Sequence, residues 1–241
     1  MSLQILHYSE RMNKSSLALP PLTTSGRKLA PLIDHSLLSA NAAAEDIRRL
    51  CAEARFYGFC AVCVRPQWVP LACAELAGTG IAPATVIGFP SGSPPTAVKV
   101  REAEQAVAAG ALELDMVLAL WALKDQEYKT VGEDIAAVVR AAGPGRLVKV
   151  ILETCLLTEE EKITACRLAV DAGAGFVKTS TGFAGGGATV EDVRLLRRTV
   201  GPTFGVKASG GIRTAEAARA LVAAGANRLG TSASVAIVTT D

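Results

Sequence analysis

Short apolar runs alternate with helical patterns along most of this chain. Eight runs rich in Val, Ile, Leu and Phe predict strands at 28–34, 59–64, 84–89, 112–118, 147–152, 175–179, 203–207 and 227–231. Between them, apolar residues recur at helical spacing and predict helices at about 44–57, 66–77, 95–109, 127–142, 158–172, 189–199 and 214–224, with a stub after 232. Strict alternation of strands and helices is typical of a parallel sheet covered by helices.

Glycines mark the joints between these elements. Four stand between the end of a helical pattern and the next strand, at Gly58, Gly110, Gly173 and Gly225. Eight such units favour a closed (β/α)8 TIM barrel in a single α/β domain, and no G-x-G-x-x-G follows the first strand to support a dinucleotide-binding fold. We expect residues 28–241 to form the barrel and residues 1–27 to be an N-terminal tail or packing arm.

Composition and charge narrow the choice of partners. The 241 residues carry a net charge of +2, which gives no basic footprint for nucleic acid or anionic membranes. The longest apolar stretch, 108–123, is interrupted by Glu113 and Asp115 and therefore predicts no membrane span. Residues 1–27 have no pattern of a secretory signal, so a cytoplasmic location is expected.

The cysteines and histidines predict no metal site and no cofactor. Six cysteines in a chain without a signal are expected to be reduced thiols, and Cys60 and Cys63 form a C-x-x-C without a second pair of ligands. The two histidines, His7 and His35, are too few to build a metal centre.

Three valine-lysine pairs recur in phase in the second half of the chain. Lys149, Lys178 and Lys207 are separated by equal intervals of 29 residues, and each lies in a mostly apolar predicted strand. This interval matches one strand-plus-helix unit, so equivalent strands should aim three amines into one space. Strand alternation then places these lysines inside the barrel, together with Glu113 and Asp115 of the fourth strand.

A lysine that is buried beside another cation loses its proton more easily, and the neutral amine can attack a carbonyl to form a Schiff base. The alternative is that these lysines form structural ion pairs or face water. Three in register beside an acid favour the catalytic interpretation.

The predicted ends of the last three strands carry glycines and hydroxyls suited to an anion. Thr181 and Gly182 follow the sixth strand, Gly210 and Gly211 the seventh, and Ser232 the eighth. In barrels, the loops after the seventh and eighth strands often bind phosphate. Arg213 could reach such a phosphate, although a surface position is the favoured interpretation.

Several motifs together resemble one enzyme family. They are the runs 33–38, 86–90, 113–117, 176–183 and 205–213, the most specific being Phe-Val-Lys-Thr-Ser-Thr-Gly-Phe and Val-Lys-Ala-Ser-Gly-Gly-Ile-Arg. In this order they resemble the deoxyribose-phosphate aldolases, over about residues 30 to 234. The resemblance implies a metal-free class I aldolase that reversibly splits 2-deoxy-D-ribose 5-phosphate into D-glyceraldehyde 3-phosphate and acetaldehyde, in deoxyribonucleoside catabolism.

The resemblance also implies roles for individual residues. Lys178 would be the Schiff-base nucleophile, Lys207 the neighbouring amine that lowers its pKa and shares in proton transfer, and Asp115 the acid/base that works through water. Asp34 matches a polar position near the substrate hydroxyls, with a helix N-cap or turn as its alternative. Cys63 matches a cysteine near the active site, and a buried structural thiol is equally compatible.

Lys149 is expected to support the site rather than react, through a pair with Asp115 or Glu153. Three positions depart from the family pattern: Ala119 and Arg65, each in place of a usual Asn, and Ala233, in place of a second serine. Ala233 removes a hydroxyl from the expected phosphate site.

Two other functions remain open from the sequence alone. One is another Schiff-base barrel, such as a transaldolase-like enzyme or a lysine-dependent pyridoxal-phosphate-forming synthase, against which the paired motifs of the sixth and seventh strands argue. The other is a catalytically silent phosphate-binding barrel, which would have no reason to keep both lysines and Asp115. Assembly as a homodimer or homotetramer is compatible with the sequence, which does not fix the number of subunits.

Overall fold

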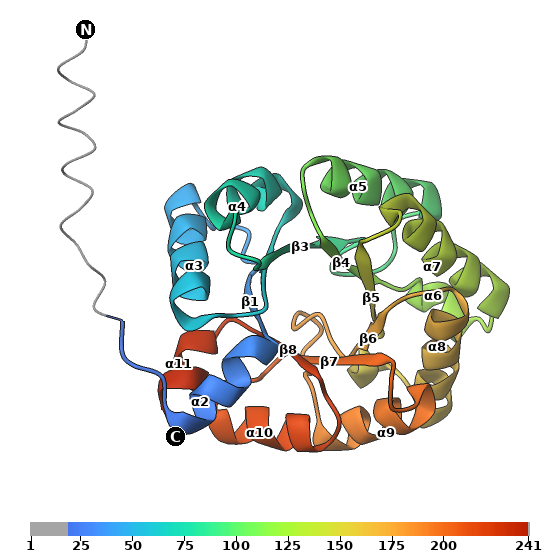
Figure 1. The fold of residues 1–241 in the computed structure, drawn as a ribbon. Helices are drawn as coiled ribbons and strands as arrows, with labels where there is room; N and C mark the ends of the chain where they lie inside the picture. Colours follow the sequence, from blue (N-terminus) through green and yellow to red (C-terminus); the bar gives the residue numbers. More distant parts are fainter. Residues whose placement is uncertain (1–18, 241) are drawn as a thin grey trace, which may run out of the picture.

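The computed structural model describes residues 19–240, in which eight parallel strands close into a barrel inside a ring of helices (Figure 1). The strands run in chain order around the barrel: β1 (Ile33–Leu37), β2 (Ala61–Val64), β3 (Ala82–Ile87), β4 (Glu113–Val117), β5 (Leu147–Ile151), β6 (Phe176–Lys178), β7 (Gly205–Ser209) and β8 (Arg228–Thr231). The helices are α2 (Thr24–Leu29), α3 (Ala44–Tyr57), α4 (Val69–Leu76), α5 (Thr96–Ala108), α6 (Leu120–Lys124), α7 (Tyr128–Ala142), α8 (Glu159–Asp171), α9 (Val190–Val200), α10 (Ala215–Ala223) and α11 (Ser234–Thr239), with short 3-10 turns at Ala30–Leu32, Pro66–Trp68 and Thr154–Leu156. The predicted TIM barrel is confirmed.

The first strand is the least accurate of the predicted elements. It was expected at 28–34, but residues 24–32 are helical and β1 begins at Ile33. The reason is local, because the Thr23 hydroxyl accepts a hydrogen bond from the Gly26 N–H at 2.9 Å and so begins α2. Helix α2 crosses the boundary expected between residues 27 and 28, and residues 1–18 of the expected arm lie outside the described residues.

Helix α2 joins the beginning of the described chain to its end. It packs against α11 (Figure 1), and a Cβ on Gly26 would collide with the carbonyl oxygen of Val238. The Thr23 N–H also donates to the Val238 carbonyl at 3.0 Å. The N-terminal helix therefore holds the last helix of the barrel in place, close to the loop after β8.

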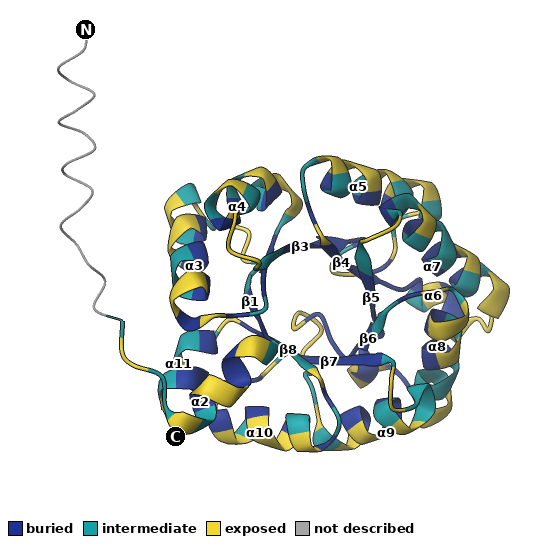
Figure 2. Cartoon of the chain, viewed as in Figure 1, coloured by how far each residue is buried: buried dark blue, intermediate teal, exposed yellow. Residues whose placement is uncertain are grey.

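Parallel register aligns the charged residues of neighbouring strands. Asp115 is paired with Lys149 across β4 and β5, and Lys178 is paired with Lys207 across β6 and β7. Since strand side chains alternate, the valine before each lysine enters the core between strands and helices, while the lysine enters the barrel interior, here called the lumen. Figure 2 shows the strands mostly buried and the helices exposed on their outer faces.

A second, smaller apolar cluster fills one side of the lumen. Ala61 and Cys63 of β2 and Ala84 and Val86 of β3 are almost fully buried there, on the same face of the sheet as Glu113 and Asp115. The charged side chains are therefore confined to the other side of the lumen. No helix between residues 19 and 240 combines the length and apolar character needed to cross a membrane.

Helix α5 contributes a buried charge that the sequence did not point to. The Lys99 ammonium is fully buried and lies 2.6 Å from Asp134 Oδ2 of α7 and 3.0 Å from the Val117 carbonyl oxygen of β4. The other carboxylate oxygen of Asp134 accepts a hydrogen bond from Thr96 at 2.8 Å. This ion pair ties two outer helices to the end of β4, the strand that carries Asp115.

We expect Asp134→Ala to lower the free energy of unfolding by about 3–5 kcal/mol, because it leaves the Lys99 charge buried without a partner. The neighbouring Glu133 forms a solvent-exposed pair with Lys129 at 3.8 Å, so Glu133→Ala should stay within about 0.5 kcal/mol of the parent. Denaturant unfolding of both variants measures the difference. Equal effects of the two substitutions would contradict a structural role for the buried pair.

Candidate active site

Four cations and three carboxylates meet in the lumen. Six of them form a closed ring in which each cation contacts two carboxylates, here called the charge ring. In order around the ring, its members are Asp34, Lys207, Asp115, Lys149, Glu113 and Arg228. The seventh charged side chain, Lys178, contacts the ring at Asp115.

Asp115 of β4 is the carboxylate that contacts all three lysines of the lumen. Its Oδ2 lies 2.7 Å from the Nζ atoms of both Lys178 and Lys207, and its Oδ1 lies 2.8 Å from Lys149 Nζ. The carboxylate is fully buried. It therefore holds the three in-phase lysines at one point, as their shared period predicted.

Arg228 of β8 closes the ring at the bottom of the lumen. Its Nη1 lies 2.6 Å from Asp34 Oδ1 and 3.1 Å from Glu113 Oε2, and its guanidinium carbon lies 5.6 Å from the centre of the Phe176 ring. A Cβ on Gly205 would collide with that ring, so glycine leaves the space that Phe176 occupies. Lys149 completes this layer, 2.6 Å from Glu113 Oε2.

The charges in the lumen give the lysines different pKa values. Burial lowers the pKa of Lys178, and the nearby Lys207 lowers it further, against the opposing effect of Asp115. For Lys207, burial also lowers the pKa, but Asp115 and Asp34 together outweigh it and raise the pKa above that of an ordinary lysine. Of this pair, Lys178 gives up its proton more easily and Lys207 stays an ammonium.

Both acids opposite Lys207 are held as carboxylates. Burial raises the pKa of Asp115, but Lys149, Lys178 and Lys207 bring it well below the ordinary value. Asp34 follows the same rule, because Lys207, Lys149 and Arg228 outweigh burial and lower its pKa to about 2. A proton that leaves Lys178 therefore has no stable place on either carboxylate at neutral pH.

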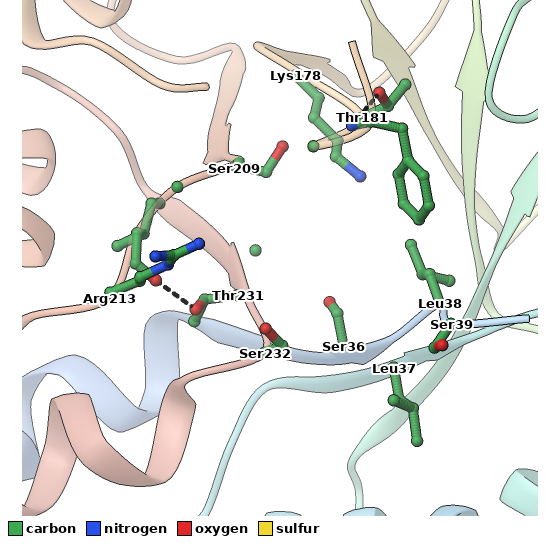
Figure 3. Close-up of a pocket in the computed structure, with 16 residues that line it drawn as sticks. Ser36, Leu37, Leu38, Ser39, Lys178, Thr181, Ser209, Arg213, Thr231 and Ser232 are labelled. Carbon is green, nitrogen blue, oxygen red and sulfur yellow. Dashed lines mark hydrogen bonds between the residues drawn. The ribbon is translucent and has the colours of Figure 1, made fainter. Parts of the chain in front are cut away.

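A cavity of 430 Å³ opens above Lys178 at the carboxyl ends of the strands (Figure 3). Its wall includes all the residues of the predicted anion site: Thr181, Gly182, Gly210, Gly211 and Ser232. Arg213 also lines the cavity, although its side chain is exposed, so the expectation of a surface position was only half right. Lys178 and Arg213 reach the cavity from different walls (Figure 3).

The glycine loops of this cavity pack backbone against backbone. Gly210 has φ +87°, and a Cβ there would lie 3.1 Å from the Cα of Gly187 and 3.3 Å from the Cβ of Ser180. A Cβ on Gly187 would collide with the Gly210 carbonyl oxygen, so glycine at this position lets the loops after β6 and β7 meet. Ala188 N–H donates to the Gly210 carbonyl at 3.0 Å and fixes this contact.

Asp34 lies in the charge ring, fully buried, and is absent from the cavity wall. Its carboxylate forms ion pairs with Lys207 and Arg228 rather than a helix N-cap, and its place near the substrate hydroxyls stays a prediction. Lys149 pairs with Asp115, as one of its two alternatives proposed, and with Glu113. The other candidate partner, Glu153, lies elsewhere and contacts Thr181.

Arg228 is the site residue that the sequence interpretation missed. Alternation along β8 places it on the same face as Gly230, which also lies against Lys207. That signal was available, but a single arginine at the start of a strand has no repeat to mark it.

Two further buried side chains, those of His35 and Cys63, do not line the cavity. His35 of β1 is buried, with Nδ1 2.8 Å from Ser234 Oγ of α11 and Nε2 2.8 Å from Glu53 of α3. Cys63 is a buried thiol of the apolar side of the lumen, and burial raises its pKa to about 11. Between residues 19 and 240, no three His, Cys, Asp or Glu side chains are grouped to hold a metal ion.

Comparison with known proteins places this site in a family. The family model of the DeoC/LacD family aldolases matches residues 28–236. The chain belongs to this aldolase family. It is 57% identical to the deoxyribose-phosphate aldolase of Bacillus cereus strain AH187 over 213 residues, which cover 88% of this chain and 96% of the relative.

Solved structures agree with this placement. A crystal structure of a Coccidioides immitis protein matches with a TM-score of 0.86 and 44% identity, covering 98% of this chain and 94% of that one. The deoxyribose phosphate aldolase of Aeropyrum pernix, described as a tetramer, matches with a TM-score of 0.83 and 37% identity, covering 90% and 92%.

Glu153 is a buried acid of this aldolase that the charge ring does not use. It follows β5 with φ +58°, an uncommon backbone conformation for a residue with a side chain. Its carboxylate accepts hydrogen bonds from the Thr181 hydroxyl and, at 3.2 Å, from the Thr181 N–H. The Thr181 oxygen in turn accepts from the Phe183 N–H at 3.0 Å. Glu153 therefore fixes the turn that forms one wall of the cavity.

We expect Glu153→Gln to raise KM about tenfold with a smaller change in kcat, because an amide oxygen replaces a carboxylate that binds this turn. Glu160→Gln, on the exposed start of α8, serves as the control and should leave KM unchanged. Steady-state kinetics of the cleavage reaction measure both. An unchanged KM in Glu153→Gln would contradict the positioning of the cavity wall by this acid.

Proposed function

We propose that this aldolase cleaves 2-deoxy-D-ribose 5-phosphate reversibly into D-glyceraldehyde 3-phosphate and acetaldehyde, through a Schiff base on Lys178. The observation that carries this proposal is the position of Lys178. Among the described lysines, it is the one whose side chain lines the cavity, and burial together with Lys207 lowers its pKa. Family membership and the name of the Bacillus cereus relative support the same reaction.

The first half of the reaction forms the Schiff base. The neutral Lys178 amine attacks C1 of the open-chain sugar, and the carbinolamine loses water to give a protonated iminium. Lys207 holds a proton because its pKa is raised, and since it shares Asp115 Oδ2 with Lys178, a proton can pass from it toward the departing oxygen. Asp115 keeps the two amines close enough for protons to pass between them.

The second half breaks the carbon–carbon bond. The C3 hydroxyl loses its proton, the C2–C3 bond breaks, and its electron pair moves to the iminium to give an enamine, while C3 to C5 leave as glyceraldehyde 3-phosphate. Protonation of the enamine at C2 gives the iminium of acetaldehyde, and water then releases acetaldehyde and the amine. Lys207, and Asp115 acting through water, are the groups proposed to exchange these protons.

The phosphate is assigned to the glycine loops of the cavity. Gly210 and Gly211 have left-handed backbones that turn N–H groups toward an anion, and Thr181, Ser232 and Arg213 add donors. Ala233 supplies no side-chain hydroxyl. Arg213 therefore carries more of the phosphate recognition than it would beside a second serine.

Two alternative functions fit the site less well. A silent phosphate-binding barrel would not need Lys178 and Lys207 on a shared carboxylate, and a charged lumen without chemistry is costly. A different Schiff-base enzyme would act on a different substrate, so an assay of deoxyribose 5-phosphate cleavage distinguishes it from the proposed function.

Assembly as a homodimer or homotetramer is also a proposal, supported by exposed apolar side chains such as Phe56 and Trp121 and by the Aeropyrum pernix relative.

Acetaldehyde followed by borohydride should inactivate the protein irreversibly and add a two-carbon group to the peptide that carries Lys178. Peptide mass spectrometry locates the label. Lys178→Ala should lose both label and activity, while Lys129→Ala, whose side chain is 89% exposed, should keep both. Full activity in Lys178→Ala would rule out this mechanism.

Arg213→Met should raise KM for deoxyribose 5-phosphate about ten- to a hundredfold, since a hydrogen bond to a charged group contributes about 1.5–3 kcal/mol. Cleavage of 2-deoxyribose without its phosphate should be nearly unaffected. The exposed Arg198→Met is the matched control. Equal losses on both substrates would place Arg213 outside phosphate recognition.

A further inference from the structure

The charge ring contains equal numbers of positive and negative groups. Its three carboxylates lie on Asp34, Glu113 and Asp115. Each of its three cations contacts two of these carboxylates, and each carboxylate contacts two of the cations. One further contact crosses the ring, from Lys149 to Asp34 at 3.7 Å. The six groups therefore neutralise one another without help from outside.

Lys178 is the fourth cation of the lumen when it is protonated, and no carboxylate remains for it. It contacts only Asp115, which already has two cationic partners. Its side chain is almost fully buried, so water compensates little of the charge. The balanced lumen is the one in which Lys178 is a neutral amine.

No other strand supplies a charge to change this count. The sides formed by β2 and β3 are apolar, and burial raises the pKa of both Cys60 and Cys63, so these thiols stay neutral. Thr85 donates its hydroxyl to the Val64 carbonyl. The acid beyond β5, Glu153, is bound to Thr181 rather than to a lumen lysine.

We propose that Arg228 is a positioning residue for the reaction: by closing the charge ring from the bottom of the lumen, it balances the carboxylates and leaves the Lys178 amine in its reactive neutral form. Arg228 does not line the cavity and touches no part of it. It acts through Asp34 and Glu113, to which it lies 2.6 and 3.1 Å away. This inference rests on the proposed Schiff-base function.

The inference makes opposite predictions for the two partners of one ion pair. Arg228→Met leaves the ring with one excess negative charge, which favours the ammonium form of Lys178, so the reaction should need a higher pH. Glu113→Gln leaves one excess positive charge, which disfavours that form, so the reaction should persist to a lower pH. The double variant restores the balance. A purely structural ion pair would make both single variants fail in the same way.

The test is the pH dependence of labelling by acetaldehyde and cyanoborohydride at Lys178, followed by mass spectrometry, because acetaldehyde has no titrating group. The pH of half-maximal labelling should rise by about one unit in Arg228→Met and fall by a similar amount in Glu113→Gln, as expected for one charge that acts across the lumen at an effective dielectric constant of about 20. The double variant and Arg228→Lys should lie near the parent. Arg198→Met removes the same charge from an exposed site on α9 and should not move the profile.

The outcomes separate this inference from the function on which it rests. Absence of labelling at Lys178 in the parent protein would overturn the proposed function. Labelling in the parent with equal or same-direction shifts in the two single variants would overturn the charge-balance role alone. If Arg228→Met does not fold, Glu113→Gln and Arg228→Lys decide the question, since an unshifted Glu113→Gln profile contradicts the inference.

Discussion

Every charge inside this barrel must meet an opposite charge, because the free energy of removing it from water is large. The charge ring satisfies that constraint with six side chains from five strands, and each carboxylate lies between two cations. The constraint also produces the chemistry. A seventh charge in the lumen is unfavourable, because no carboxylate remains to balance it. The seventh ionisable group is Lys178, which lines the cavity. The balance between positive and negative groups therefore stabilises the lumen, and in the proposed function it also sets the reactivity of the Lys178 amine.

The strand register explains why these side chains can meet at all. Lys178 and Lys207 are paired across β6 and β7, while Lys149 lies opposite Phe176, two residues lower in the register; the three amines nevertheless converge on Asp115. Asp115 contacts them through different oxygen atoms: Oδ1 contacts Lys149, and Oδ2 contacts both Lys178 and Lys207. What distinguishes Lys207 from Lys178 is its second carboxylate, on Asp34. The pKa values of the three lysines therefore differ because the charged groups around them differ.

The sequence predicted the parts of the structure that follow from periodicity. The strict alternation of strand and helix patterns led to the barrel, and the equal spacing of the lysines with the alternation on the fourth strand led to the lysines and Asp115 in its lumen. The start of β1 was wrong because the Thr23 cap, a local hydrogen bond, decides it. Arg228 was missed because no repeat marks it, although alternation along β8 places it toward the lumen, and the partners of Lys99 could not be predicted because they depend on contacts between elements distant in sequence. Asp34 was expected at the end of the first strand, but it lies near the beginning of β1, where it forms buried ion pairs.

The charged lumen and the cavity form two layers of the barrel, and this arrangement favours one orientation of the proposed substrate. The charged lumen lies below, the cavity with its glycine loops lies above, and Lys178 is the residue that belongs to both. In the proposed function, a phosphate held by the loops after β6, β7 and β8 stays above the lumen, where the carboxylates and cations balance one another and offer it no partner. The far end of the sugar, its uncharged carbonyl, is the part that can enter between the loops and reach the amine. The proposed function therefore places the carbonyl end of a phosphorylated aldehyde at Lys178, and Arg213, which lines the cavity near an Ala233 without a hydroxyl, is the cation proposed to bind the other end.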